Sequence, residues 1–351
     1  YYGLIERTVA DQYAPKNVRM NNVLPGWIDA HCHIGVFNDG LVDEGSDGNE
    51  ITDPVTPQLR AVDAIFHQDR CYGEAAAGGV TSAMTGPGSA NVIGGTFIAV
   101  KTVGHRADDM MVKTDVAMKC AFGENPKRVY REKGISSRMT NAAKLRETLF
   151  KAKEYMQKKE AAGDDASKLP AFDMKLEAML PVLRREIPLK AHAHATEDLF
   201  TAIRVAKEFG VRLTLEHVTE GHLIADDLAR EGLPLAVGPT LTHASKFELR
   251  NKTWLTPAVL SQAGCQVSII TDAPVIPQEH LPLCAGLAVK AGMDKFEALK
   301  AITINPARHM GLEDRLGSLE ADKDADIVLT DGCPFEVSTT VKRVYVNGQA
   351  V

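Results

Sequence analysis

Short apolar runs and longer amphipathic stretches alternate along this chain, most regularly after residue 185. The apolar runs predict buried strands, and the stretches between them have the periodicity of helices. The predicted order is strand 189–193, helix 196–209, strand 211–217, helix 223–231, strand 235–238, helix 257–263 and strand 267–272. Thr196 is the expected N-cap of its helix, and Gly210 is the expected stop.

The first half of the chain shows the same alternation less clearly. The predicted elements are strands at 23–31, 79–85 and 116–122, helices at 139–162 and 172–185, and a polar linker at 163–170. Strand–helix repeats indicate parallel strands with helices packed outside them. About eight such units over roughly 300 residues favour an α/β fold closed as a (β/α)8 TIM barrel over an open sheet.

The C-terminal tail has a different pattern. Apolar runs at 325–329 and 341–346 predict antiparallel strands, and Asn347-Gly348 is a hairpin turn signal. We therefore expect a small β-sandwich formed by the N- and C-terminal segments beside the barrel. The predicted boundaries are a partial sandwich segment at 1–22, the barrel at 23–312 and the return into the sandwich at 313–351.

Composition narrows the class of protein. With 351 residues, 44% of them hydrophobic and 25% charged, the chain has the balance of a globular protein. A net charge of -6 argues against a nucleic-acid partner, and no apolar run approaches the roughly 18 residues of a membrane span. The six cysteines include no C-x-x-C pair, which is typical of reduced thiols. Since no signal peptide is visible either, we expect a cytoplasmic protein.

Histidines and carboxylates stand where the predicted strands end. His31 and His33 close the first strand, and residues two apart on a strand share a face, so both imidazoles could bind one ion. The other strand ends carry Glu124, His192, His194, His217 and Asp272. The carboxyl ends of barrel strands meet at the catalytic face. Because imidazole nitrogen and carboxylate oxygen suit Zn²⁺ and similar divalent ions, the pattern predicts a metal site there.

A catalytic metal site needs more than ligands. It also needs an open position for water, whose pKa the metal lowers towards neutrality. A nearby carboxylate can take the proton of that water and pass it to a leaving group, and Asp272 has the type and position for this role. Lys190 shares the face of His192, and a buried lysine needs a partner, for which Asp29 and Glu216 are candidates.

These residues make the sequence similar to the amidohydrolase superfamily. The similarity rests on His31-Cys32-His33, His192, His217 and Asp272, and on the stretches 24–31, 298–306 and 317–326. Within the superfamily the chain most resembles the imidazolonepropionase-like branch, which includes metal-dependent prolidase-type peptidases. The resemblance implies a metal-dependent hydrolase that cleaves a C–N bond in an amide, peptide-like or cyclic amide substrate. A metal-bound hydroxide would be the nucleophile, and Asp272 would be the general acid and base.

The resemblance also implies which residues bind metal. The implied ligands are His31, His33, His192, His217 and Asp272. His192 is preferred to His194, which is then expected to contact substrate or to support the ligands. Binuclear members bridge two ions with a carboxylated lysine or a glutamate at the end of strand four. Here Glu124 is favoured, while Lys119 lies deeper on the same strand with opposite parity.

Further expectations concern the metal ions, the remaining histidines and the alternative functions. One or two ions are expected, with Zn²⁺ first and Mn or Fe as alternatives. His243, in the loop after the strand at 235–238, is expected to contact a small-molecule substrate. His309 and the other histidines away from strand ends are expected to be structural. The alternative functions are a metal-dependent deaminase and a non-catalytic protein on the same scaffold, and such barrels are compatible with a homo-oligomer.

Overall fold

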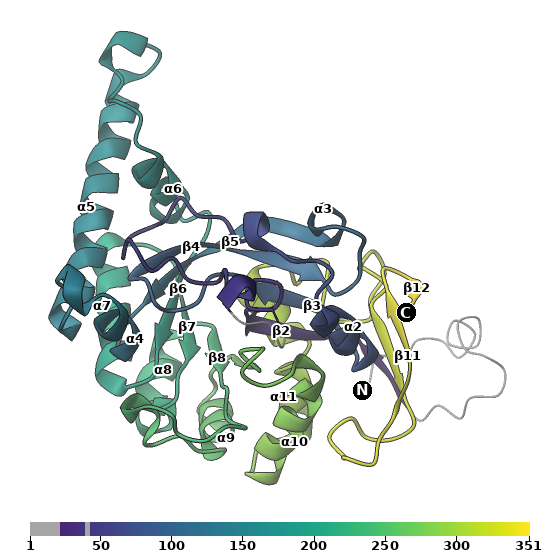
Figure 1. The fold of residues 1–351 in the computed structure, drawn as a ribbon. Coiled ribbons are helices and arrows are strands. Elements are labelled where there is room, and N and C mark those ends of the chain that lie inside the picture. The colour runs from purple at the N-terminus through teal and green to yellow at the C-terminus, as the bar shows by residue number, and fades with distance from the viewer. Residues whose placement is uncertain (1–21, 39–42) are drawn as a thin grey trace.

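A single sheet of eight strands forms the centre of the molecule. The computed structural model describes residues 22–38 and 43–351. Within them the strands neighbour one another in chain order: β2 (Trp27–Cys32), β3 (Val80–Thr85), β4 (Ile93–Lys101), β5 (Met111–Ala121), β6 (Leu189–Ala193), β7 (Leu213–His217), β8 (Leu235–Val237) and β9 (Val267–Ile269). The N–H of Asp272 donates to the carbonyl of His31 (3.2 Å), and that of His33 donates to Ala273 (2.7 Å). These bonds join the two ends of the sheet into a nearly closed barrel, as predicted (Figure 1).

One strand of the barrel runs against the others. β4 pairs antiparallel with β3 and with β5, whereas the remaining neighbours pair in parallel. Our strand predictions omit β4, because Gly94 and Gly95 near its start resemble a turn. A Cβ on Gly95 would lie 2.3 Å from the carbonyl oxygen of Leu59, so this glycine permits a close approach of two backbones.

Helices surround the barrel. They are α2 (Arg70–Ala77), α3 (Ala107–Met110), α4 (Glu124–Val129), α5 (Arg138–Ala162), α6 (Met174–Leu183), α7 (Thr196–Phe209), α8 (Ala225–Glu231), α9 (Leu255–Gln262), α10 (Leu281–Lys290), α11 (Lys295–Lys300) and α12 (Ile304–Met310). The predicted helix at 196–209 is α7, and Gly210 ends it in the left-handed conformation. The N-cap is Ala195 and not the predicted Thr196, because the carboxylate of Glu220 accepts the N–H of Thr196 (2.9 Å) from another loop.

The barrel strands are buried on both faces. Every residue of β2, β3, β4, β6 and β7 is buried, so these strands have no solvent-facing side. Polar side chains also lie inside. The Nζ atoms of Lys119 and Lys190 lie 5.3 Å and 5.2 Å from the centre of the Phe97 ring. The interior of this barrel is therefore both packed and charged.

A second, antiparallel sheet lies beside the barrel, on the side away from the long helix α5 (Figure 1). Its strands, in spatial order, are β1 (Asn22–Pro25), β10 (Ile327–Thr330), β11 (Val341–Val346) and β12 (Gln349–Ala350). The tail strands predicted at 325–329 and 341–346 correspond to β10 and β11. Of the sandwich segment predicted at 1–22, only Asn22 lies within the described residues.

The strand predicted at 23–31 is in fact two strands in two different sheets, β1 and β2. Gly26 separates them, and its N–H donates to the carbonyl of Asp326 (2.9 Å). A Cβ on Gly26 would lie 2.1 Å from Oγ1 of Thr81, so only glycine fits at this crossing. The apolar pattern runs through the break, and for this reason the sequence does not reveal it.

Two further predictions concern the chain as a whole. Among the helices of residues 22–38 and 43–351, none combines the length and the apolar character needed to cross a membrane. All six cysteines lie within these ranges as free thiols, as their spacing predicts.

Candidate metal centre and active site

The predicted ligands meet at the carboxyl ends of four barrel strands. His31 lies in β2, His192 lies in β6 and His217 is the last residue of β7. His33 directly follows β2, and Asp272 follows β9. All five side chains are largely buried, and the most accessible of them, Asp272, is 14% exposed.

Two of these residues have an unusual backbone conformation. The φ angles of His217 and Asp272 are 73° and 55°, in the left-handed region. Residues other than glycine rarely adopt this conformation, and it persists only where the surrounding structure holds it. Such strain concentrates at functional sites, which agrees with the position of both residues at the barrel mouth.

The candidate ligand atoms form two groups that share His217. One group contains His192, His194 and His217, and the other contains His31, His217 and Asp272. Within each group these atoms lie within 4.8 Å of one another. His33 lies next to the second group, since its Nε2 is 3.2 Å from Oδ1 of Asp272. The structure thus brings both His192 and His194 to the site.

Hydrogen bonds to the backbone orient the imidazoles. The Nδ1 of His33 lies 2.7 Å from the carbonyl oxygen of Gly86, and the Nδ1 of His217 lies 2.8 Å from that of Gly238. Metal-binding histidines typically use one ring nitrogen in this way and keep the other for the ion. In both residues Nε2 is the nitrogen left to bind.

Several buried histidine nitrogens have no hydrogen-bond partner, and this indicates whether a metal ion would fit the site. Among the described residues, the Nε2 of His217 and both ring nitrogens of His192 make no hydrogen bond, although they are buried. Unpaired buried polar atoms cost free energy, and a cation would satisfy them. The donor set of imidazole nitrogens and a carboxylate is one that Zn²⁺ and similar ions prefer. The residues therefore fit a divalent metal.

Electrostatics keep the ligands in their binding forms. Burial lowers the pKa of His217 to about 4, and it lowers the pKa values of His31 and His192 well below their usual range. Burial alone would raise the pKa of Asp272, but its interactions with His217, His33 and Lys119 outweigh burial and lower that pKa. Neutral imidazoles and an ionised carboxylate are the forms that bind metals.

Lys119 lies among the ligands, whereas Glu124 does not. The Nζ of Lys119 is 3.3 Å from Nε2 of His31, and burial together with the charge of Lys190 lowers the pKa of Lys119 to about 7. Glu124 begins α4, and its carboxylate accepts the backbone N–H of Glu248 (2.9 Å). Because the chain turns into a helix at the strand exit, the structure does not bring Glu124 into either ligand group.

Comparison with known proteins shows the family of the chain. A model described as the amidohydrolase family matches residues 22–351. The chain belongs to the amidohydrolase family. The solved structure of an amidohydrolase from Thermotoga maritima MSB8 is similar to this amidohydrolase, with a TM-score of 0.91 and 42% sequence identity, over 96% of this chain and 91% of that one.

Curated relatives of this amidohydrolase agree with the predicted resemblance. Amidohydrolase tasK of Hapsidospora irregularis is 29% identical over 354 residues, which cover 93% of this chain and 36% of that protein. An imidazolonepropionase of Thermoplasma volcanium is 40% identical over 120 residues, which cover 32% of this chain and 30% of that protein. The resemblance to amidohydrolases and imidazolonepropionases is confirmed. The chain covers only about a third of the length of these curated relatives.

A buried charge network supports His31 in this amidohydrolase. Oε2 of Glu216 accepts hydrogen bonds from Nδ1 of His31 (3.1 Å) and Nζ of Lys190 (2.8 Å), and Oε1 accepts one from Nε2 of His309 (2.9 Å). Burial would raise the pKa of Glu216, but Lys190 and His309 hold it well below its usual range. Asp29 and Glu216 are the predicted partners of Lys190, and in the structure Lys190 pairs with Glu216. His309, expected to be structural, is part of the support beneath the ligands.

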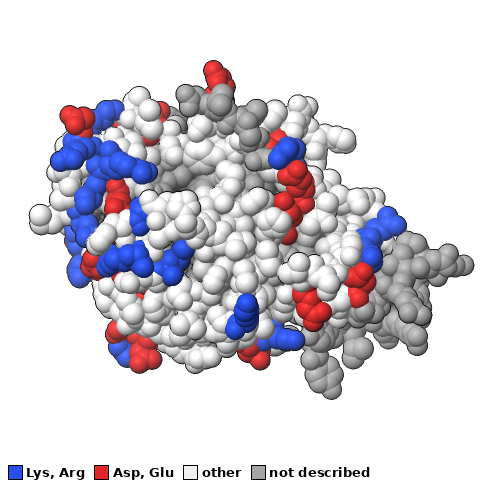
Figure 2. Space-filling model, turned by 60° about the horizontal axis from the view of Figure 1, so that its bottom comes forward, with Lys and Arg blue, Asp and Glu red and all other residues white. Residues whose placement is uncertain are grey.

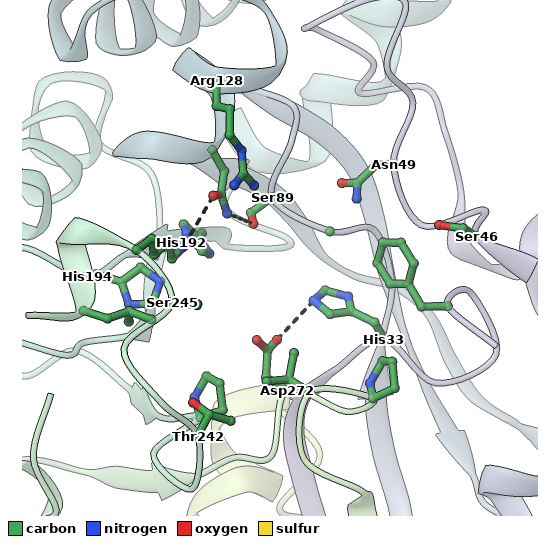
Figure 3. A pocket seen from close by; sticks show the side chains of 18 of the residues that line it. His33, Ser46, Asn49, Ser89, Arg128, His192, His194, Thr242, Ser245 and Asp272 are labelled. Carbon is green, nitrogen blue, oxygen red and sulfur yellow. Dashed lines mark hydrogen bonds and ion pairs between the residues drawn. The ribbon is translucent and has the colours of Figure 1, made fainter. Parts of the chain in front are cut away.

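A cavity of about 790 Å³ adjoins the ligands of the amidohydrolase. His33 and Asp272 lie on one side of it and face His192 and His194 on the other (Figure 3). The two predicted substrate contacts, His194 and His243, both line the cavity. Figure 2 shows a hollow on this face, with Lys and Arg side chains gathered to its left. A cavity of this size suits a small-molecule substrate.

Proposed function

We propose that this amidohydrolase uses a divalent metal, with Zn²⁺ as the first candidate, to hydrolyse a C–N bond in an amide, peptide-like or cyclic amide substrate. The observation that carries the proposal is the pair of buried ligand groups that share His217 at the barrel mouth. The adjoining cavity has the size of a small-molecule site. When bound, the metal would lower the pKa of a water molecule and polarise the substrate carbonyl.

The ligands divide between two ions in this proposal. His31, His33 and Asp272 would hold one ion, and His192 and His217 would hold the other. Lys119 is the better candidate for the bridge, because its Nζ lies 3.3 Å from a ligand nitrogen. Its lowered pKa of about 7 also favours the neutral amine that carboxylation requires. With Lys119 unmodified, a single ion would be expected.

Asp272 would act as the general acid and base. Its Oδ1 lies 3.5 Å from Nε2 of His31 and 3.2 Å from Nε2 of His33, so the carboxylate and the two ligand nitrogens face the same point. A carboxylate placed there can accept a proton from the attacking water and deliver it to the leaving nitrogen. His194 and His243 both line the cavity and would contact the substrate.

A substrate screen with metal-loaded protein tests the proposal. N-acyl amino acids, dipeptides and cyclic ureides would be incubated with the Zn²⁺- or Mn²⁺-loaded enzyme, and the amine and carboxylate released would be measured. We expect hydrolysis in at least one of these classes, lost on chelation and restored by metal. Release of ammonia from an amino-substituted heterocycle, without amide hydrolysis, would identify a deaminase instead. A protein that binds no metal would overturn the proposal.

A further inference from the structure

Glu248 is a buried carboxylate beside the candidate ligands, and the sequence pattern does not point to it. It lies in a 3-10 turn (Phe247–Leu249) in the long connection between β8 and α9, away from every strand end. Its side chain is 0% exposed. A charged group buried to this extent is costly unless it is paired or binds a cation, so its surroundings indicate its role.

One oxygen of the Glu248 carboxylate is held by a hydrogen bond from the backbone. Oε2 accepts the N–H of Glu124 (3.0 Å), and the carboxylate of Glu124 in turn accepts the N–H of Glu248 (2.9 Å). A Cβ on Gly123 would lie 2.3 Å from this Oε2, and Gly123 has a φ of 78°. Only glycine leaves room for the oxygen at this point. The carboxylate is therefore fixed through Oε2, on the side away from the histidines.

The other oxygen of Glu248 faces the ligands. Oε1 lies 3.7 Å from Nε2 of His192 and 3.6 Å from Nε2 of His194. These separations are too long for hydrogen bonds. They are close to the distance between two ligands of one tetrahedral ion, roughly 3.4 Å for bonds of about 2.0–2.2 Å. His194 is oriented for this, since its Nδ1 lies 2.7 Å from Oγ1 of Thr219 and Nε2 is left to bind.

We propose that Glu248 is a further metal ligand, through Oε1, for the ion held by the group of His192, His194 and His217. The inference rests on the proposed metal dependence and adds a carboxylate from the β8–α9 connection to ligands from the strand ends. It also makes His194 a ligand and not only a substrate contact. Three imidazoles and a carboxylate form the kind of mixed set that Zn²⁺ binds.

Lys246 offers a competing explanation for the same carboxylate. Its Nζ lies 2.5 Å from Oε1 of Glu248, and its side chain is 17% exposed at the cavity wall. Glu248 could therefore serve only to hold Lys246 in place. The two roles differ in what removal of the lysine does. If Glu248 is a ligand, the ammonium competes with the ion and its removal does not weaken metal binding.

The test measures metal binding by the full chain and does not depend on activity. Zn²⁺ affinity is determined by competition with a chromophoric chelator, and the Co²⁺-loaded protein is examined by its visible absorption. Glu248→Gln keeps the shape of the side chain and removes its charge. We expect at least about a tenfold loss of Zn²⁺ affinity at one site and a shifted Co²⁺ spectrum, because an oxygen ligand is lost.

Two further variants control for charge and for Lys246. Asp198→Asn removes another buried carboxylate next to Gly123, one that pairs with Arg138 at 3.0 Å, and we expect unchanged affinity and spectrum. Lys246→Met is expected to keep or increase the affinity. If Lys246→Met reproduces the loss seen with Glu248→Gln, Glu248 acts by anchoring the lysine and the inference is wrong.

Unchanged affinity and spectrum in Glu248→Gln would also overturn the inference. If that variant does not fold, Glu248→Asp is measured in its place. It keeps the charge and shortens the reach, so a shifted Co²⁺ spectrum supports the ligand role and an unshifted one opposes it. Wild-type protein that binds no metal refutes the proposed function itself. Wild-type binding that Glu248 does not influence refutes only this inference.

Discussion

At the scale of single residues, Asp272 combines the properties that the proposed reaction needs. It is buried, its pKa is lowered by neighbouring positive charge in spite of that burial, and it contacts both histidines of the His-x-His pair. We expect Asp272→Asn to lower kcat by about 10²- to 10⁴-fold, because an amide does not accept the proton. Steady-state kinetics of the metal-loaded variant check this, with metal content measured in parallel. Full activity at wild-type metal content would refute the role.

The cost of replacing Gly123 has two parts, the strain of its backbone conformation and the clash with the Glu248 carboxylate. Alanine there has to adopt a φ of 78° and meets the Glu248 carboxylate at 2.3 Å. The backbone alone should cost about 1–2 kcal/mol, and displacement of a buried carboxylate should add to this. Gly134→Ala is the matched control, since its φ is 83° and nothing lies within 4 Å of its Cβ position. Urea denaturation compares them, and equal losses of stability would contradict the close approach.

At the scale of elements, a buried ion pair joins the small sheet to the barrel. Lys101, at the end of β4, lies 2.6 Å from Asp326 and 3.0 Å from Asp324, next to β10, and its side chain is only 4% exposed. Lys101→Met leaves the buried carboxylate of Asp326 without its cation, whereas Asp324 keeps Arg315 at 3.0 Å. We expect it to lower the free energy of unfolding by about 3–5 kcal/mol.

An exposed ion pair provides the comparison for Lys101. Lys144, in α5, lies 2.9 Å from Glu147, and both side chains are more than 40% exposed. Lys144→Met should cost about 0–1 kcal/mol, because solvent screens the pair. Urea unfolding of both variants measures the difference. A Lys101→Met variant as stable as Lys144→Met would show that the junction depends on packing and not on this charge.

At the scale of the whole molecule, an ion at the barrel mouth would link β2, β6, β7 and β9. A ligand that binds only the folded state stabilises it by about 2.7 kcal/mol at a hundred times its Kd. We expect chelation to lower the thermal unfolding midpoint and added Zn²⁺ to restore it. His217→Ala should lose most of this response, because His217 belongs to both ligand groups. His280→Ala, at an exposed histidine outside both groups, should keep it; calorimetry with and without metal compares the two.

The sequence by itself determined the features that depend on neighbouring residues. The helix at 196–209 with its Gly210 stop follows from a local periodicity and a local backbone preference. The placement of His31, His192 and His217 at strand ends follows in the same way, because burial of parallel strands produces apolar runs with recognisable ends. These local signals were sufficient to predict a barrel and a metal site at its mouth.

Tertiary structure alone decided which side chains share that site. Lys119 rather than Glu124 lies beside His31, because the chain turns into α4 at the strand exit. Glu248 reaches His192 and His194 from a distant loop, through a space that only Gly123 leaves open. Contacts of this kind join segments far apart in the chain, so no local pattern records them. They exist only once the barrel has closed and fixed the distances between its loops.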